Sequence, residues 1–216
     1  MKFDAVLFDC DGVLVDSEAI TCGVLRDMLE ERGWALTLQQ CMDIFVGNTV
    51  TDKRSDIEAR TGLPLTQDWL MGFRDRRNAA LVADIQAIPN IHQAVRDLHL
   101  ATNGRIACAS GADRFKVEMM LKQVGLADYF AGNIFSGHEM PRSKPHPDVY
   151  LAAAAHLGVD PLRCAVVEDT ATGVRAGVAA GATVFGYAPT GAGQALLDAG
   201  AHGLFGDMAD LHGVLR

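Results

Sequence analysis

The sequence predicts an α/β protein whose core is a doubly wound, Rossmann-like parallel sheet. Wholly apolar runs at residues 5–8, 106–109 and 165–167 each end abruptly at a polar residue. Runs of this kind are typical of strands that are buried on both faces of a parallel sheet. Weaker runs follow at 133–135 and 183–185, and helical stretches that close at glycine separate the strands, at 115–124, 147–157 and 172–180.

A second, all-helical region interrupts this alternation directly after the first strand. Its four helical stretches span residues 17–32, 38–46, 52–60 and 67–83, and no strand pattern separates them. We therefore expect a core domain of residues 1–15 and 88–216. Residues 16–87 are expected to form an inserted α-helical cap domain over the carboxyl edge of the sheet.

Composition excludes several classes of function. The 216-residue chain has a net charge of −8 and no run of five like charges, which argues against nucleic acid as a partner. No apolar stretch is long enough to span a membrane, and we expect a cytoplasmic protein, either a monomer or a small homo-oligomer. Five scattered cysteines without a C-x-x-C pair are expected to be buried, reduced thiols: Cys10, Cys22, Cys41, Cys108 and Cys164.

The polar residues that end the apolar runs are the strongest indication of a site. Asp9, Ser110 and the pair Glu168-Asp169 lie far apart in the sequence, yet a parallel sheet brings the ends of its strands to one edge. Carboxylates crowded together need a cation, and oxygen ligands favour Mg²⁺, which commonly works with phosphate. A carboxylate also serves as a nucleophile in some phosphoryl transfers, and Asp11 is placed to act as an acid and base beside it.

Four motifs in order resemble the signatures of the haloacid dehalogenase superfamily, in the branch with a helical cap. The first is Phe8-Asp9-Cys10-Asp11-Gly12-Val13-Leu14-Val15-Asp16-Ser17-Glu18. The others are Ala109-Ser110-Gly111, Ser143-Lys144-Pro145-His146-Pro147 and Val167-Glu168-Asp169-Thr170-Ala171-Thr172-Gly173. The resemblance extends over essentially the whole chain.

The resemblance implies a phosphatase mechanism with an aspartyl-phosphate intermediate on Asp9. Asp11 would protonate the leaving alcohol and then activate water. The implied phosphate-binding groups are Ser110, Gly111 and Lys144, and the implied Mg²⁺ ligands are Asp9, the Asp11 carbonyl, Glu168 and Asp169. An acid at position 11 favours phosphoryl transfer over dehalogenation, since a halide leaves without protonation.

The expected substrate is a small phosphorylated metabolite, a sugar or sugar-acid phosphate, with 6-phosphogluconate among the candidates. Candidate cap contacts to the leaving group are Asn48, Lys53, Arg54 and Arg74. One alternative is a phosphomutase like β-phosphoglucomutase, although Thr21 and Val50 stand where such mutases have histidine and arginine. A more distant alternative is a non-catalytic, metal-dependent anion-binding protein on the same scaffold.

Overall fold

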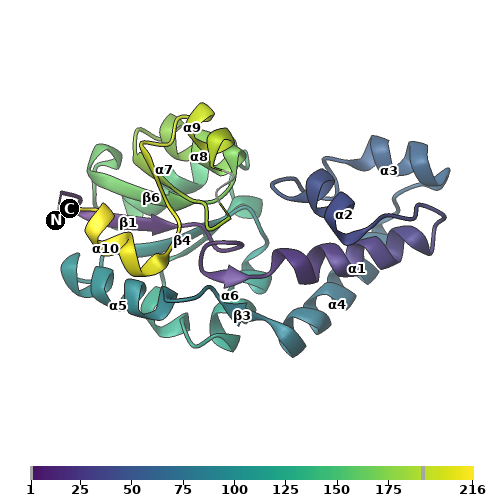
Figure 1. Cartoon of the computed structure of the whole chain (residues 1–216), viewed down its shortest axis with the longest axis horizontal. Coiled ribbons are helices and arrows are strands. Elements are labelled where there is room, and N and C mark those ends of the chain that lie inside the picture. Colours follow the sequence, from purple (N-terminus) through teal and green to yellow (C-terminus); the bar gives the residue numbers. More distant parts are fainter. Residues whose placement is uncertain (1, 191–192) are drawn as a thin grey trace. The chain divides into compact units, whose positions relative to one another are not determined.

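The computed structural model describes residues 2–190 and 193–216, and the chain divides into two compact units. Unit 1 comprises Met1–Asp16 and Gln86–Arg216, and unit 2 comprises Ser17–Ile85. The strands and the helices from α5 (Ile91–Ala101) onward belong to unit 1, whereas the helices from α1 (Glu18–Glu30) to α4 (Gln67–Asp84) make up unit 2 (Figure 1).

Unit 1 is built on a six-stranded sheet in the order β5-β4-β1-β6-β7-β8, with parallel neighbours throughout. At its centre, Phe8 pairs with Cys108 on one side and with Val167 on the other. The observed sheet confirms the predicted α/β fold. It also contains a short last strand, β8, that the sequence analysis did not predict. The strands are β1 (Ala5–Phe8), β4 (Ile106–Ser110), β5 (Ile134–Ser136), β6 (Cys164–Glu168), β7 (Thr183–Tyr187) and β8 (Gly203–Phe205).

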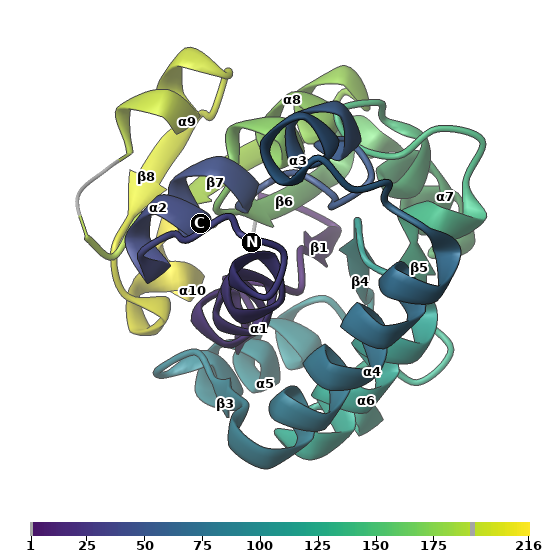
Figure 2. The same cartoon turned by 90° about the vertical axis from the view of Figure 1, so that its right-hand side faces the viewer.

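Helices cover both faces of this sheet. Helices α7 (Asp148–His156) and α8 (Ala171–Ala179) lie on one side, and α5 (Ile91–Ala101), α6 (Arg114–Gln123) and α10 (Leu211–Val214) lie on the other (Figures 1 and 2). The remaining short helices are η1 (Ala127–Phe130), η2 (Gly137–Glu139), η3 (Pro161–Arg163), α9 (Gln194–Asp198) and η4 (Met208–Asp210). Among the described helices, none combines the length and the apolar character that a membrane crossing requires.

A buried apolar cluster lies between the sheet and helices α7 and α8. Leu7, Ala107 and Val166 face this layer, where they pack with Tyr150 and Val174 in one buried cluster. Alternate residues of each strand point to the same face, so each central strand supplies side chains to both layers.

A small second sheet joins the two chain segments at the ends of unit 2. Strand β2 (Val15–Asp16) pairs antiparallel with β3 (Gln86–Ala87), and the Ile88 amide donates to the Leu14 carbonyl over 3.1 Å. Our sequence analysis found no strand here, because two residues are too few to show an alternating pattern.

Unit 2 consists of the four expected helices, and each helix begins and ends within two residues of the range predicted from the sequence. They are α1 (Glu18–Glu30), α2 (Leu38–Phe45), α3 (Arg54–Thr61) and α4 (Gln67–Asp84). Thr37 and Gln40 form a reciprocal capping box at the start of α2, and Gly62 ends α3 in the left-handed conformation with φ 66°. Buried apolar side chains such as Leu29, Ile57 and Phe73 hold the helices together.

The five cysteines are free and buried, as expected from their scattered positions. Cys10 lies between Asp9 and Asp11, and a hydrogen bond with Cys108, followed by burial, raises the pKa of its thiol well above the usual value. A thiol in such surroundings is a poor nucleophile. Asp9 and Asp11 therefore remain the reactive candidates of this segment.

The packing of α8 generates a stability prediction. A β-carbon at Gly177 would lie 2.7 Å from Val184 Cγ2 and 3.2 Å from Val166 Cγ1. We expect Gly177→Ala to lower the free energy of unfolding by about 1–3 kcal/mol through overpacking. Gly213→Ala is the matched control, since a β-carbon there has no neighbour within 4 Å, and it should instead stabilise α10 by about 0.5–1 kcal/mol. Thermal melting of both variants measures the effect, and equal melting temperatures would contradict it.

Candidate active site

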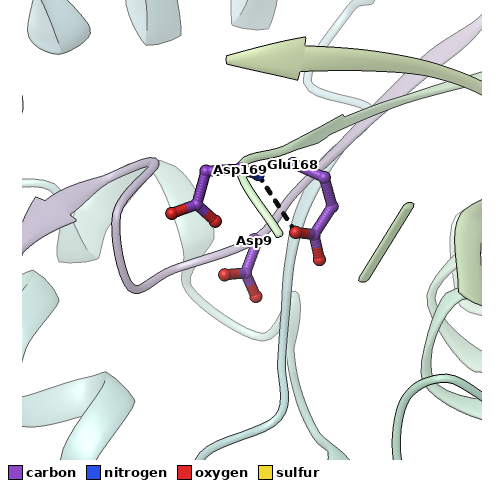
Figure 3. Close-up of side chains that lie close together, drawn as sticks. All are labelled: Asp9, Glu168 and Asp169. Atoms are coloured by element: carbon purple, nitrogen blue, oxygen red, sulfur yellow. Dashed lines mark hydrogen bonds between the residues drawn. The ribbon is translucent and has the colours of Figure 1, made fainter. Parts of the chain in front are cut away.

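The carboxyl edge of the sheet brings together the polar residues that end its central strands. Ser110 and Glu168 are the last residues of β4 and β6, and Asp9 follows β1 between them. The Asp9 amide donates to the Val167 carbonyl over 3.0 Å, which fixes the backbone of Asp9 against β6. Figure 3 shows Asp9, Glu168 and Asp169 side by side at this edge.

Lys144 connects two of these carboxylates. Its Nζ donates to Asp9 Oδ1 over 2.6 Å and to Glu168 Oε1 over 2.7 Å. Only 8% of the Lys144 side chain and 10% of the Asp9 side chain are exposed, and Glu168 is fully buried. Burying one of these charges alone would cost several kcal/mol. The lysine and the two acids therefore stabilise one another as a set.

The same environment sets the protonation of the two central groups. Burial raises the pKa of Asp9 to about 7; the Lys144 ammonium opposes this effect, and the neighbouring Glu168 and Asp11 add to it. Burial by itself would lower the pKa of Lys144, but the charges of Asp9 and Glu168 outweigh it and hold that pKa well above its usual range. Lys144 therefore stays cationic, whereas Asp9 ionises near neutrality.

Glu168 is held by hydrogen bonds to both of its oxygens. Oε1 accepts from Lys144 and, over 2.8 Å, from the hydroxyl of the buried Tyr150 on α7. Oε2 accepts from the Asp169 amide and from both the amide and the hydroxyl of Thr170. Our sequence analysis did not identify Tyr150. A tyrosine six residues after the motif lysine has the pattern of an ordinary core residue, so only the fold reveals its contact with Glu168.

The acidic cluster has the composition of a site for a hard cation. Asp9, Glu168 and Asp169 each offer a carboxylate oxygen, and these oxygens lie within 4.8 Å of one another. Gly12, at φ +76°, packs so closely on Asp169 that a β-carbon at this position would overlap the carboxylate. The loop after β1 thus leaves space for the Asp169 carboxylate in the cluster. An all-oxygen, carboxylate-rich donor set fits Mg²⁺ rather than Zn²⁺.

Ser110 presents a hydroxyl at the same edge of the sheet, at the end of β4. Its Oγ accepts a hydrogen bond from the Ala112 amide over 3.0 Å, so the hydroxyl hydrogen remains to be donated. The Ser136 hydroxyl donates to the Ala112 carbonyl over 2.6 Å and holds the same turn from β5. Gly111 follows Ser110 in this turn, so its amide belongs to the same strand end.

Asp11 makes a contact that our sequence analysis did not foresee. Lys116 Nζ on α6 donates to Asp11 Oδ1 over 2.6 Å, and the two side chains are 7% and 24% exposed. Each of the two motif aspartates is therefore paired with a lysine: Asp9 with Lys144 and Asp11 with Lys116. Lys116 lies outside the four motifs, and a single lysine on an amphipathic helix normally indicates a solvated face.

The candidate substrate contacts of unit 2 occupy different settings within that unit. The Arg54 guanidinium donates to the Leu65 carbonyl over 2.6 Å and to Glu58 over 3.2 Å, so it stabilises the turn after α3. Lys53 is the N-cap residue of α3, and Arg74 is an exposed residue of α4. The Asn48 amide donates to carbonyls at the end of α2. Their role in substrate binding stays a prediction.

Comparison with known proteins agrees with this fold. The family of haloacid dehalogenase-like hydrolases matches residues 3–181. Hexitol phosphatase B of Escherichia coli (strain K12) is 30% identical over 179 residues, which cover 82% of this chain and 79% of the relative. The 6-phosphogluconate phosphatase of the same strain is 27% identical over 185 residues, covering 85% and 82%. A crystal structure of a HAD family hydrolase from Deinococcus radiodurans R1, with bound phosphate and sodium, is 35% identical. It has a TM-score of 0.80 and covers 99% of this chain and 95% of that chain.

The parallel sheet with a carboxylate cluster at its carboxyl edge defines an α/β protein with a candidate active site at that edge. The chain belongs to the haloacid dehalogenase-like hydrolases, as the four motifs predicted, and its relatives in that family include proteins named as phosphatases.

The tight packing around Glu168 generates a prediction for activity. A β-carbon at Gly173 in α8 would overlap the Glu168 carboxylate. Gly173→Ala should therefore displace Glu168 and, through it, Lys144, and lower kcat/KM roughly ten- to a hundredfold because positioning is lost. Arg175→Ala, at an exposed position of the same helix, is the control. Unchanged turnover of a generic aryl phosphate by Gly173→Ala would show that the exact position of Glu168 does not matter.

Proposed function

We propose that this protein is a Mg²⁺-dependent phosphatase of small phosphorylated metabolites that works through an aspartyl phosphate on Asp9. The observation that carries the proposal is the 2.6 Å contact between the buried Lys144 ammonium and Asp9 Oδ1, inside a cluster of carboxylates. A purely structural ion pair would need no further acids around it. Here Glu168 and Asp169 add negative charge that a cation has to balance.

In the first step a carboxylate oxygen of Asp9 attacks phosphorus. A new O–P bond forms, the ester O–P bond breaks, and the proton of Asp11 goes to the departing alcohol oxygen. In the second step water attacks the same phosphorus as it gives a proton to Asp11. The bond between phosphorus and Asp9 breaks, and inorganic phosphate is released with both aspartates restored.

The positive groups of the site act on the transferring phosphoryl oxygens. Lys144 offers a permanent cation, and the Ser110 hydroxyl and Gly111 amide offer donors at the end of β4. Preorganised donors of this kind each contribute about 3–4 kcal/mol to transition-state stabilisation. Mg²⁺, bound by Asp9, the Asp11 carbonyl, Glu168 and Asp169, would neutralise charge between the carboxylates and the phosphoryl group.

We assign the substrate to the sugar, polyol and sugar-acid phosphates. The support comes from the relatives named hexitol phosphatase B and 6-phosphogluconate phosphatase, each of which matches more than four fifths of this chain. A screen of such phosphates tests the assignment. A phosphatase releases inorganic phosphate in amounts equal to the alcohol. A phosphomutase would return an isomeric phosphate ester and little inorganic phosphate, and that result would reverse the choice between the two activities.

Asp9→Asn tests the nucleophile. The amide keeps the size of the carboxylate but is not nucleophilic, so we expect turnover to fall at least ~1,000-fold, about 4 kcal/mol in barrier height. The turnover rate is measured as release of inorganic phosphate from a generic aryl phosphate. Asp128→Asn, at an exposed position of unit 1, makes the same change in charge away from the sheet edge. If Asp9→Asn kept more than about a tenth of the activity, Asp9 would not be the nucleophile.

The raised pKa of Asp9 predicts how metal binding responds to pH. Removal of metal with EDTA should abolish activity, and Mg²⁺ should restore it. Because Mg²⁺ takes the carboxylate form, protons compete with it wherever Asp9 is protonated, which is below about pH 7. We expect Mg²⁺ affinity, measured by calorimetry, to be constant above this pH and to fall up to about tenfold per pH unit below it. Affinity that fell only below about pH 4 would indicate a carboxylate with an ordinary pKa.

A further inference from the structure

Lys116 is a buried cation outside the motifs. It lies in the first turn of α6 with 6% of its surface exposed. A lysine is rarely buried to this degree unless its ammonium is paired. Its Nζ donates to Asp11 Oδ1 over 2.6 Å, within the range of a charge-assisted hydrogen bond.

The surrounding structure fixes the position of this ammonium. The Asp113 side chain caps α6 by accepting from the Lys116 amide over 2.9 Å. The neighbouring Arg114 binds both oxygens of Glu139 over 2.7 and 2.6 Å. The start of α6 is therefore anchored to the loop before Lys144, and the side chain of Lys116 extends from a rigid position.

Topology explains why this lysine meets Asp11. Strands β1 and β4 are parallel neighbours in the sheet, so their carboxyl ends lie at the same edge. Asp11 lies just beyond β1, and α6 begins just beyond β4. Lys144 reaches Asp9 from a different loop. The two lysines thus act on different aspartates, and Lys116 holds the one to which the proposed mechanism gives the proton.

We propose that Lys116 is the positioning residue for the acid–base carboxyl of Asp11. By holding Oδ1, the ammonium restricts rotation of the Asp11 side chain and so orients the carboxyl group that passes its proton to the leaving oxygen. Loss of this contact would loosen the orientation of the carboxyl group toward the leaving oxygen. This inference rests on the proposed function, in which Asp11 supplies that proton.

The dependence of the first step on the leaving group tests this role. Para-nitrophenolate leaves readily without a proton, whereas phenolate is more basic and depends more on an acid. Single-turnover release of both phenols, with enzyme in excess and Mg²⁺ present, isolates transfer to Asp9 from hydrolysis of the intermediate. We expect Lys116→Met to slow phenyl phosphate at least roughly tenfold more than para-nitrophenyl phosphate, because loss of a general acid costs 10²–10⁴-fold. Equal slowing of both esters, or none, would overturn the proposal.

Further variants separate this role from a structural one. Lys122→Met, at an exposed position of α6, removes the same charge and should leave the ratio of the two rates unchanged. Lys116→Gln keeps a donor and should shift the ratio in the same direction but less, and it serves as the test variant if Lys116→Met does not fold. A ratio unchanged in both Lys116 variants counts against the positioning role.

Asp11→Asn distinguishes failure of the inference from failure of the proposed function. If Asp11→Asn changes the ratio and the Lys116 variants do not, only the positioning role is wrong. If Asp11→Asn leaves the ratio unchanged, or Asp9→Asn still releases phenol at the wild-type rate, the proposed mechanism fails and the role of Lys116 fails with it.

Discussion

The site depends on one buried ion cluster, in which the Lys144 ammonium lies between Asp9 and Glu168. Each member would be unstable at its position without the others, since desolvation penalises an isolated charge heavily. The rest of the edge maintains this cluster. Tyr150 and Thr170 hold Glu168, the β1–β6 pairing holds Asp9, and the close contact of Gly12 with Asp169 keeps a further carboxylate beside them. Removal of one partner therefore affects the geometry of the others as well as the local charge.

The site residues at the carboxyl ends of strands could be predicted from the sequence. Asp9, Ser110 and Glu168 could be found because an apolar run that stops at a polar residue marks both a strand and its carboxyl end. The four helices of unit 2 were also predictable, because caps and glycine stops are local signals. Strand β8, by contrast, has only three residues, and its place beside β7 is decided by long-range packing rather than by its own sequence.

Lys116 and Tyr150 show why the remaining part of the site could not be predicted. Both lie on helices, where a single lysine or tyrosine has the same local pattern whether it faces solvent, core or a catalytic group. Their hydrogen bonds at the edge of the sheet are with residues 105 and 18 positions away in the sequence, Asp11 and Glu168. Contacts of this kind follow from strand order and helix placement, which are properties of the assembled sheet.

The turn at Ser110 has a consequence for the polarity of what can bind there. The Ala112 amide donates to Ser110 Oγ, and the Ser110 hydroxyl retains its own hydrogen to donate. At the same edge of the sheet the Lys144 ammonium is a second donor, and the charges of Asp9 and Glu168 hold its pKa well above the usual range. A ligand group that carries its own hydrogens, such as an amide NH₂ or an ammonium, would place donor against donor. A fully deprotonated oxyanion presents acceptors in every direction. Ser110 and Lys144 thus favour, by hydrogen-bond direction, a ligand group that only accepts.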